Sequence, residues 1–334
     1  MKKLIVLTSS LIFSMIIAGD FGGYSIFEYD NDAFDMKRVY LKYSNNISDD
    51  LNFKLTYDVG RDDDGDDTTA DDTKLSSYLK HAYINYNKSF GTISLGVIGT
   101  NSYGAQEKTW GYRFIQKSAL DKAKWTNTAD FGIGYAKSFG DINVSAQILN
   151  GEGYKKTQDS EGGFAVYLRL LYGEGKLNKN DGFNVGLVIN NHADDQLVAL
   201  FGGWAKDKIR TGLEYNRLDA GSNSYVMLAN YLNYSLSDRW DVFMRNDRVE
   251  TVETSNTETN TYLGAIWKAH QNFHIAPSFT MSDGNNDGTS TSIIIASEPL
   301  TRNDSSWFEI QKYSMAVIDR IDGKIKVDIR DFGI

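Results

Sequence analysis

Residues 51–60, LNFKLTYDVG, decide the fold of this chain because their side chains alternate strictly in character. The odd-numbered positions, such as Phe53 and Tyr57, are apolar or aromatic, whereas the even-numbered positions are polar or glycine. Successive side chains of a β-strand point to opposite faces of the sheet. The stretch is therefore expected to be a strand with one apolar face and one polar face.

The same alternation recurs along almost the whole chain beyond Asp20. Runs of about ten residues are separated by Gly, Asn, Asp and Ser, which favour turns. None of these runs carries a sustained apolar stripe with the period of a helix. Sixteen candidate strands result, an even number: 21–30, 36–45, 50–61, 72–87, 89–99, 127–138, 140–150, 161–173, 181–191, 195–205, 206–218, 222–235, 239–250, 259–268, 271–281 and 288–296.

The connections between these strands fall into two alternating sets. One set is short, and its longest member is 173–180; the others are 44–49, 87–89, 138–140, 205–208, 236–238 and 268–271. The alternate set includes the longest connections: 61–71, 100–126, 151–160, 250–258 and 282–287. An antiparallel meander with this sorting has one trimmed end and one elaborated end, as membrane β-barrels do. A soluble sandwich has no reason to sort its loops in this way.

Composition excludes several other classes of protein. The 334 residues include 20 Tyr, 17 Phe, 6 Trp and 30 Gly, but no Cys, and the net charge is −9. Disulfide frameworks, cysteine metal sites and thiol catalysis are therefore excluded. A helical membrane protein with several spans would need runs of roughly 20 apolar residues, which the chain lacks beyond its N-terminus. The acidic balance also argues against nucleic acid as a partner.

The N-terminus predicts the compartment. Lys2 and Lys3 precede an apolar stretch over 4–18, and Gly19 and Asp20 follow it. A short basic region before a 15-residue apolar core is typical of a secretory signal peptide, here 1–18, read by Sec-type export. An uncleaved membrane anchor is the alternative.

The two-faced strands predict a closed sheet. In lipid every backbone polar group must pair internally, so a sheet can span a membrane only without edges. The apolar face would meet lipid and the polar face a hydrated lumen. The expected fold class is an all-β transmembrane antiparallel up-and-down barrel. Aromatic residues near the predicted strand ends favour a membrane girdle over ordinary strand packing: Tyr43, Tyr57, Tyr86, Tyr135, Tyr172, Tyr215, Tyr234, Trp240 and Trp267.

Taken together, these features resemble the bacterial outer-membrane general porins over about 20–296. The turn pieces 46–49, 138–141 and 236–238 are similar to periplasmic turns of that family. The resemblance implies a water-filled outer-membrane channel for passive diffusion of ions and small hydrophilic solutes, with short periplasmic turns and long external loops. It further implies a homotrimer in contact with outer-membrane lipid and lipopolysaccharide, with no cofactor and no chemical step.

In that family the long third loop folds back into the lumen and narrows it. Here that loop is 100–126, in which five cations face two anions: Glu107, Lys108, Arg113, Lys117, Asp121, Lys122 and Lys124. Fixed charges at a constriction set which ions pass. We expect a mild anion preference, and the alternative is a solvated external loop. Charged residues at the alternate positions that form the polar face of each predicted strand are candidates for the lumen wall: Arg38, Lys42, Lys54, Asp58, Arg169, Arg210, Glu214, Asp241 and Arg245.

Signals for catalysis or metal binding are weak. His270 and His274 straddle a predicted turn without the glutamate of a zinc protease. The acidic run at 62–67 lacks the spacing and closing glutamate of a calcium loop. We therefore expect no enzyme, no catalytic residue, no metal site and no cofactor. A substrate-selective channel for phosphate, sugar or carboxylate is the main alternative function, and a secreted soluble β-protein that binds glycans is another.

The C-terminal segment 297–334 lies beyond the last candidate strand of the predicted barrel, 19–296. Residues 313–320 and 324–329 alternate around Asp322-Gly323, the signature of a hairpin turn. The tail either adds two strands, which would make eighteen, or forms a periplasmic appendage.

Overall fold

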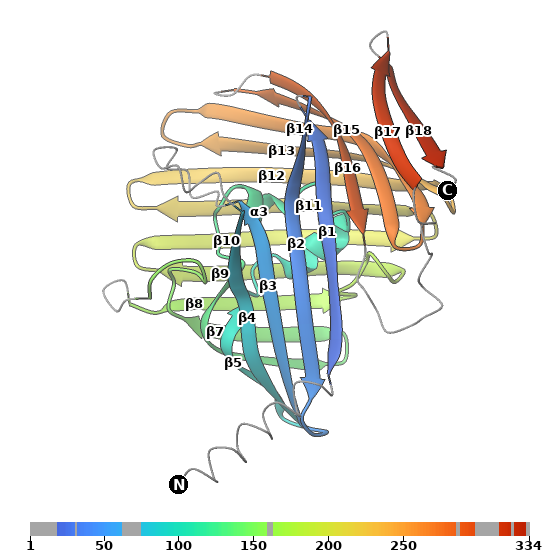
Figure 1. Cartoon of the computed structure of the whole chain (residues 1–334). Coiled ribbons are helices and arrows are strands. Elements are labelled where there is room, and N and C mark those ends of the chain that lie inside the picture. Colours follow the sequence, from blue (N-terminus) through green and yellow to red (C-terminus); the bar gives the residue numbers. More distant parts are fainter. Residues whose placement is uncertain are drawn as a thin grey trace. The chain divides into compact units, whose positions relative to one another are not determined.

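The structure is a computed structural model that describes residues 19–30, 32–61, 75–158, 163–284, 288–297, 314–321 and 324–331. The chain divides into two compact units, residues 1–300 and 301–334, each considered by itself (Figure 1). In the second unit, β17 (Ser314–Ile321) and β18 (Lys324–Asp331) pair with each other in an antiparallel hairpin. The predicted signal peptide lies outside the described residues.

The first unit is a closed antiparallel barrel of sixteen strands. Each strand pairs with its neighbours in the sequence, and β1 pairs with β16 to close the sheet (Figure 1). The predicted sixteen-strand barrel is thus confirmed, and the hairpin adds no strand to it. The strands are β1 (Asp20–Asp30), β2 (Ala33–Asn46), β3 (Leu51–Arg61), β4 (Leu75–Lys88), β5 (Gly91–Gly99), β6 (Ala129–Phe139), β7 (Ile142–Leu149), β8 (Ala165–Gly173), β9 (Gly182–His192), β10 (Asp195–Lys206), β11 (Ile209–Ala220), β12 (Asn223–Ser237), β13 (Trp240–Thr251), β14 (Asn256–His270), β15 (Phe273–Asp283) and β16 (Gly288–Ser297).

The two faces of each strand differ as the alternation predicts. On β3, Thr56 and Asp58 are almost completely buried inside the barrel, whereas Tyr57 is 43% exposed outside it. Trp240 and Trp267 stack on the outer face with ring centroids 6.2 Å apart. An outer surface rich in exposed Leu, Ile, Phe and Tyr suits lipid, which these side chains would meet in a membrane.

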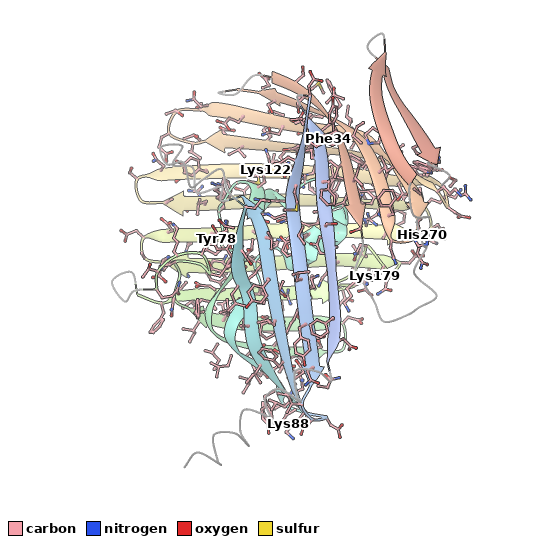
Figure 2. The ribbon with its side chains drawn as sticks, viewed as in Figure 1. Phe34, Tyr78, Lys88, Lys122, Lys179 and His270 are labelled. Carbon is pink, nitrogen blue, oxygen red and sulfur yellow. The ribbon has the colours of Figure 1, made fainter. Side chains whose placement is uncertain are left out.

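The barrel has a turn end and a loop end. At the turn end, short connections join each even-numbered strand to the odd-numbered strand that follows it, from β2–β3 to β14–β15. The loop end carries the long segment between β5 and β6, but also three tight turns that contain Asp32, Ala193 and Gly221, each with positive φ. Lys88 and Phe34, labelled in Figure 2, mark the turn end and the loop end. No helix in the described part of the chain is both long and apolar enough to cross a membrane.

Candidate functional site

The segment between β5 and β6, here called the third loop (residues 100–128), crosses the interior of the barrel. It contains the short helices α2 (Gly104–Trp110) and α3 (Ala119–Lys122), which lie inside the ring of strands in Figure 1. Asn233 on β12 donates from Nδ2 to the Trp110 carbonyl at 2.8 Å, and the Tyr231 hydroxyl on the same strand donates to the Gln106 carbonyl at 3.2 Å. These bonds to a strand that is distant in the sheet hold the loop within the lumen.

Local sequence explains where the loop turns. α2 ends at Gly111, which adopts the left-handed conformation (φ 77°) and donates its N–H to the Glu107 carbonyl. Glycine reaches this conformation without the penalty that a Cβ brings. α3 begins at Ala119, and the preceding Ser118 is its N-cap, whose Oγ accepts a hydrogen bond from the Asp121 N–H.

Aromatic packing fixes one side of the loop against the wall. Trp110 is 1% exposed, and its ring centroid lies 5.5 Å from that of Tyr231 and 5.8 Å from that of Phe243. Burial of such large side chains fills the space between the third loop and β12 to β14. The buried cluster comprises Ile26, Trp110, Ile115, Tyr231, Phe243, Tyr262, Ile266, Ala276 and Ile294.

Arg245 on β13 anchors the same side. Its guanidinium forms an ion pair with Asp247 at 2.7 Å and donates from Nη1 to the Lys117 carbonyl at 2.6 Å. It also lies 5.3 Å from the centroid of the Trp110 ring. One buried cation therefore joins the wall, the loop backbone and the aromatic cluster.

The opposite side of the loop carries charges that face the wall of β2, β3 and β4. Arg113 pairs with Glu107 at 3.0 Å and with Asp121 at 3.5 Å. On the wall, Asp58 pairs with Arg38 at 3.4 Å and with Lys80 at 3.7 Å. Three cations and three anions thus make a balanced cluster, defined by Arg38, Asp58, Lys80, Glu107, Arg113 and Asp121.

Several further cations in the lumen have no ion pair within the part of the chain that the structure describes, and Arg210 and Lys122, which contact the Trp110 carbonyl and the Tyr262 ring, are among them. Lys42 and Lys54 lie on the inner face near the turn end of β2 and β3, and Arg169 donates only to the neutral Asn143 Oδ1, at 2.6 Å. Burial and the charges of Arg169 and Lys176 lower the pKa of Lys108 on α2. We call the following four of them the unpaired cations: Lys42, Lys54, Lys108 and Arg169.

Cavities border the loop on both sides. A cavity of about 350 Å³ toward the loop end is lined by Asp58, Lys80 and Arg113 among others, and one of about 370 Å³ lies toward the turn end. A third cavity, of about 210 Å³, shares Arg113 with the first and Phe114 with the second. The loop therefore stands between spaces that open toward the two ends of the barrel.

All nine nominated wall residues lie on the inward face, but they divide into two groups. Glu214 and Arg245 are 2% and 1% exposed beneath the third loop, so they support the loop and do not border open space. Arg210 and Asp241 also contact the loop, through the Trp110 carbonyl and the Tyr112 hydroxyl. The remaining five residues contact other side chains of the barrel wall: Arg38, Lys42, Lys54, Asp58 and Arg169.

The nominated loop residues also divide. Glu107, Arg113 and Asp121 join the balanced cluster, and Lys108 is one of the unpaired cations. Lys122 on α3, labelled in Figure 2, has its Nζ 5.5 Å from the centroid of the Tyr262 ring. The Lys117 carbonyl is held by Arg245, and Lys124 lines the loop-end cavity.

The alternation of polar and apolar positions did not identify two residues that contact Asp58 in the lumen. These are Lys80 and Tyr154. On β4 the register shifts, so that Thr56 pairs with His81 while the adjacent Tyr57 pairs with Leu79. Lys80 is the extra residue of this bulge. A bulge reverses which positions face inward, so strict alternation could not nominate it.

Comparisons with known proteins agree with this architecture. The profile of a family described as phosphate-selective porin O and P matches residues 15–180. OmpF of Salmonella typhi, in complex with daunomycin, is similar with a TM-score of 0.63 and 13% identity, over 84% of this chain and 97% of that one. A trimer form of OmpT, an outer membrane protein of Vibrio cholerae, gives 0.59 and 13%, over 84% and 99%. The outer membrane channel DcaP of Acinetobacter baumannii gives 0.56 and 12%, over 84% and 96%. No curated protein sequence matches the chain.

Proposed function

We propose that the chain is a porin-like outer-membrane protein and forms a water-filled channel for passive diffusion of ions and small hydrophilic solutes, an interpretation supported by the family profile and the structural neighbours. The sixteen-strand barrel and the loop across its lumen support this function. Diffusion through such a channel involves no chemical step.

The observation that carries the proposal is the imbalance of charge beside the loop. The balanced cluster has no net formal charge, whereas Lys42, Lys54, Lys108 and Arg169 have no carboxylate partner among the described residues. Fixed charge along a narrow hydrated path selects ions of the opposite sign. The channel is therefore anion-preferring, although the chain as a whole has a net charge of −9.

Planar-bilayer recording of the purified chain tests this function. We expect stepwise ohmic openings, with a reversal potential under a salt gradient that indicates anion preference. Lys42→Glu with Lys54→Glu should shift the reversal potential toward cation selectivity, while Lys206→Glu, at an exposed position at the end of β10, should leave it unchanged. A folded barrel that conducts no current would contradict the proposal.

A channel selective for phosphate is the second candidate, because the matching family profile carries that description. The unpaired cations are compatible with an anionic solute. In a selective channel, phosphate would reduce the chloride current at low concentration and its transport would saturate. In a general channel, the current would follow bulk conductivity without saturation.

Location and assembly extend the proposal. Residues 1–18 serve as a signal peptide for Sec-type export to the outer membrane, where lipid and lipopolysaccharide surround the barrel. The protein assembles as a homotrimer, a state supported by the trimer form of a structural neighbour. Residues 298–334 then form a periplasmic appendage. Chemical cross-linking of whole cells should yield a species of three chains that dissociates on heating.

A further inference from the structure

Lysine and tyrosine side chains interleave on the inner face of β1 to β4. The Lys42 Nζ lies 4.9 Å from the centroid of the Tyr24 ring, and the Lys54 Nζ lies 5.9 Å from that of Tyr83. Lys80 repeats the arrangement on Tyr40, at 5.0 Å. We call this surface the basic aromatic wall: Tyr24, Tyr40, Lys42, Lys54, Lys80 and Tyr83.

Register explains the pattern. Tyr24 on β1 is paired with Tyr40 on β2, and their ring centroids are 4.9 Å apart. Nearer the turn end, Lys54 on β3 is paired with Tyr83 on β4. Paired residues in neighbouring strands point to the same face and contact each other. The rings and ammonium groups therefore form one continuous surface across four strands.

Part of this wall is partly exposed, and the carboxylate that acts on Lys42 and on Lys108 is Glu107 of the third loop. Tyr24, Lys42, Lys54 and Tyr83 are partly exposed, whereas Tyr40 and Lys80 are buried beside the balanced cluster. Neither Lys42 nor Lys54 has an ion pair within the described ranges of the chain. Lys108 of the third loop lies close enough to Lys54 for their charges to interact. An anion in this space would meet cations from both the wall and the loop.

The chemistry of the wall favours one kind of anion. Phosphate has no apolar surface, so a tyrosine can give it only a hydroxyl hydrogen bond and the ring face adds nothing to its binding. A flat ring that carries a carboxylate satisfies both components, because the carboxylate pairs with ammonium groups and the ring contacts a tyrosine face or edge. A lysine above a ring stays oriented by the cation–π interaction and presents its remaining N–H groups.

We propose that the partly exposed portion of the basic aromatic wall is a binding site for carboxylates borne on planar rings, of which benzoate is the simplest. The carboxylate lies between Lys42 and Lys54, and the ring packs on Tyr24 or Tyr83. This inference rests on the proposed channel function and names its preferred solute class.

The test is block of the chloride current of the full chain by benzoate, acetate and phosphate in a planar bilayer. We expect benzoate to half-block at a concentration about fivefold to tenfold below that of acetate or phosphate. At least one of Tyr24→Leu and Tyr83→Leu should bring benzoate to the level of acetate, while the phenylalanine variant at the same position, which keeps the ring, should retain the difference. Tyr86→Leu on the outer face of the same strand is the matched control and should behave as the wild type.

The outcomes separate this inference from the channel function. If chloride current and anion preference are present but benzoate blocks no better than acetate, the ring site is wrong and the channel function stands. Stronger block by phosphate than by benzoate also overturns it, in favour of an oxyanion site. If Tyr83→Leu retains preferential block by benzoate and Tyr24→Leu does so too, the rings take no part. Absence of any current removes both proposals.

Discussion

Arg245 shows how one residue decides whether the third loop stays in place. It is 1% exposed and is satisfied by Asp247 and by the Lys117 carbonyl. Arg245→Met would leave Asp247 buried without its partner, which costs about 3–5 kcal/mol when a buried pair is broken. We expect a lower urea midpoint, monitored by tryptophan fluorescence of the barrel in lipid vesicles, and larger, noisier single-channel currents.

A matched arginine on the outer face provides the control. Arg248 is largely exposed and lies 3.9 Å from Glu250, so Arg248→Met should change stability by no more than about 0.5 kcal/mol. Equal destabilisation by the two substitutions would contradict the anchoring role of Arg245.

Glu107 should make the selectivity depend on pH. Burial raises its pKa against the opposing effect of Arg113, and Asp121 raises it further. As the pH falls through this raised pKa, Glu107 is protonated and the balanced cluster gains one positive charge. The folded barrel then binds a proton that the unfolded chain would hold only at lower pH, so acidification through this window also favours the folded state.

The expected result is stronger anion preference on acidification from neutral pH to about pH 5, within the window above the ordinary pKa of glutamate. Glu107→Gln should show the acidic selectivity at all of these pH values. Reversal potentials measured along a pH series would decide this. A Glu107→Gln channel with the pH dependence of the wild type would assign the effect to another group.

At the scale of elements, the end of α2 depends on Gly111. Its positive φ strains any side chain there, and a Cβ would displace the Arg210 guanidinium from the Trp110 carbonyl. Gly111→Ala should therefore destabilise the barrel by about 2 kcal/mol or more, the sum of left-handed strain and displaced packing. The urea midpoint measures the loss, and the channel should gate more often.

Gly140 is the control for this prediction, because it has a φ of 58° and open space where a Cβ would lie. Gly140→Ala brings only the left-handed strain, about 1 kcal/mol. Similar losses for the two alanine variants would show that the contact with Arg210 contributes nothing.

The strands were predictable from sequence, whereas the roles of inward residues were not. Alternation such as that of residues 51–60 located every strand of the barrel, because a sheet between lipid and water imposes a period of two. The bulge at Lys80 interrupts that period locally, and no residue type in the sequence predicts a bulge there. The burial of Glu214 and Arg245 depends on the path of the third loop, which is set by contacts such as Trp110 with Phe243 between segments far apart in the chain.

At the scale of the whole molecule, the two sides of the lumen differ in how the third loop contacts them. The third loop packs its apolar side on β12, β13 and their neighbours, and turns its charged side toward β2, β3 and β4. The basic aromatic wall lies on β1 to β4 and includes Lys42 and Lys54, whereas the other two unpaired cations, Lys108 and Arg169, lie on the third loop and on β8. The packed side is not closed, because Arg210, Asp241 and Lys268 line the cavity of about 370 Å³ toward the turn end. Substitutions of these three residues are therefore expected to change selectivity, whereas substitutions of buried residues such as Arg245 act through stability.

Closure of the barrel needs nothing beyond β16. Ser25 and Ser297 pair across the β1–β16 seam, and their hydroxyl groups lie 2.9 Å apart. β17 and β18 pair with each other and not with the barrel strands.

A chain that ends at Ser297 should therefore refold in detergent to a heat-modifiable barrel with the single-channel conductance of the full chain. A chain that ends at residue 287 lacks β16 and exposes the edges of β1 and β15, so it should not form a stable barrel. If the first truncation fails like the second, the C-terminal unit contributes to closure, and the seam between β1 and β16 is insufficient on its own.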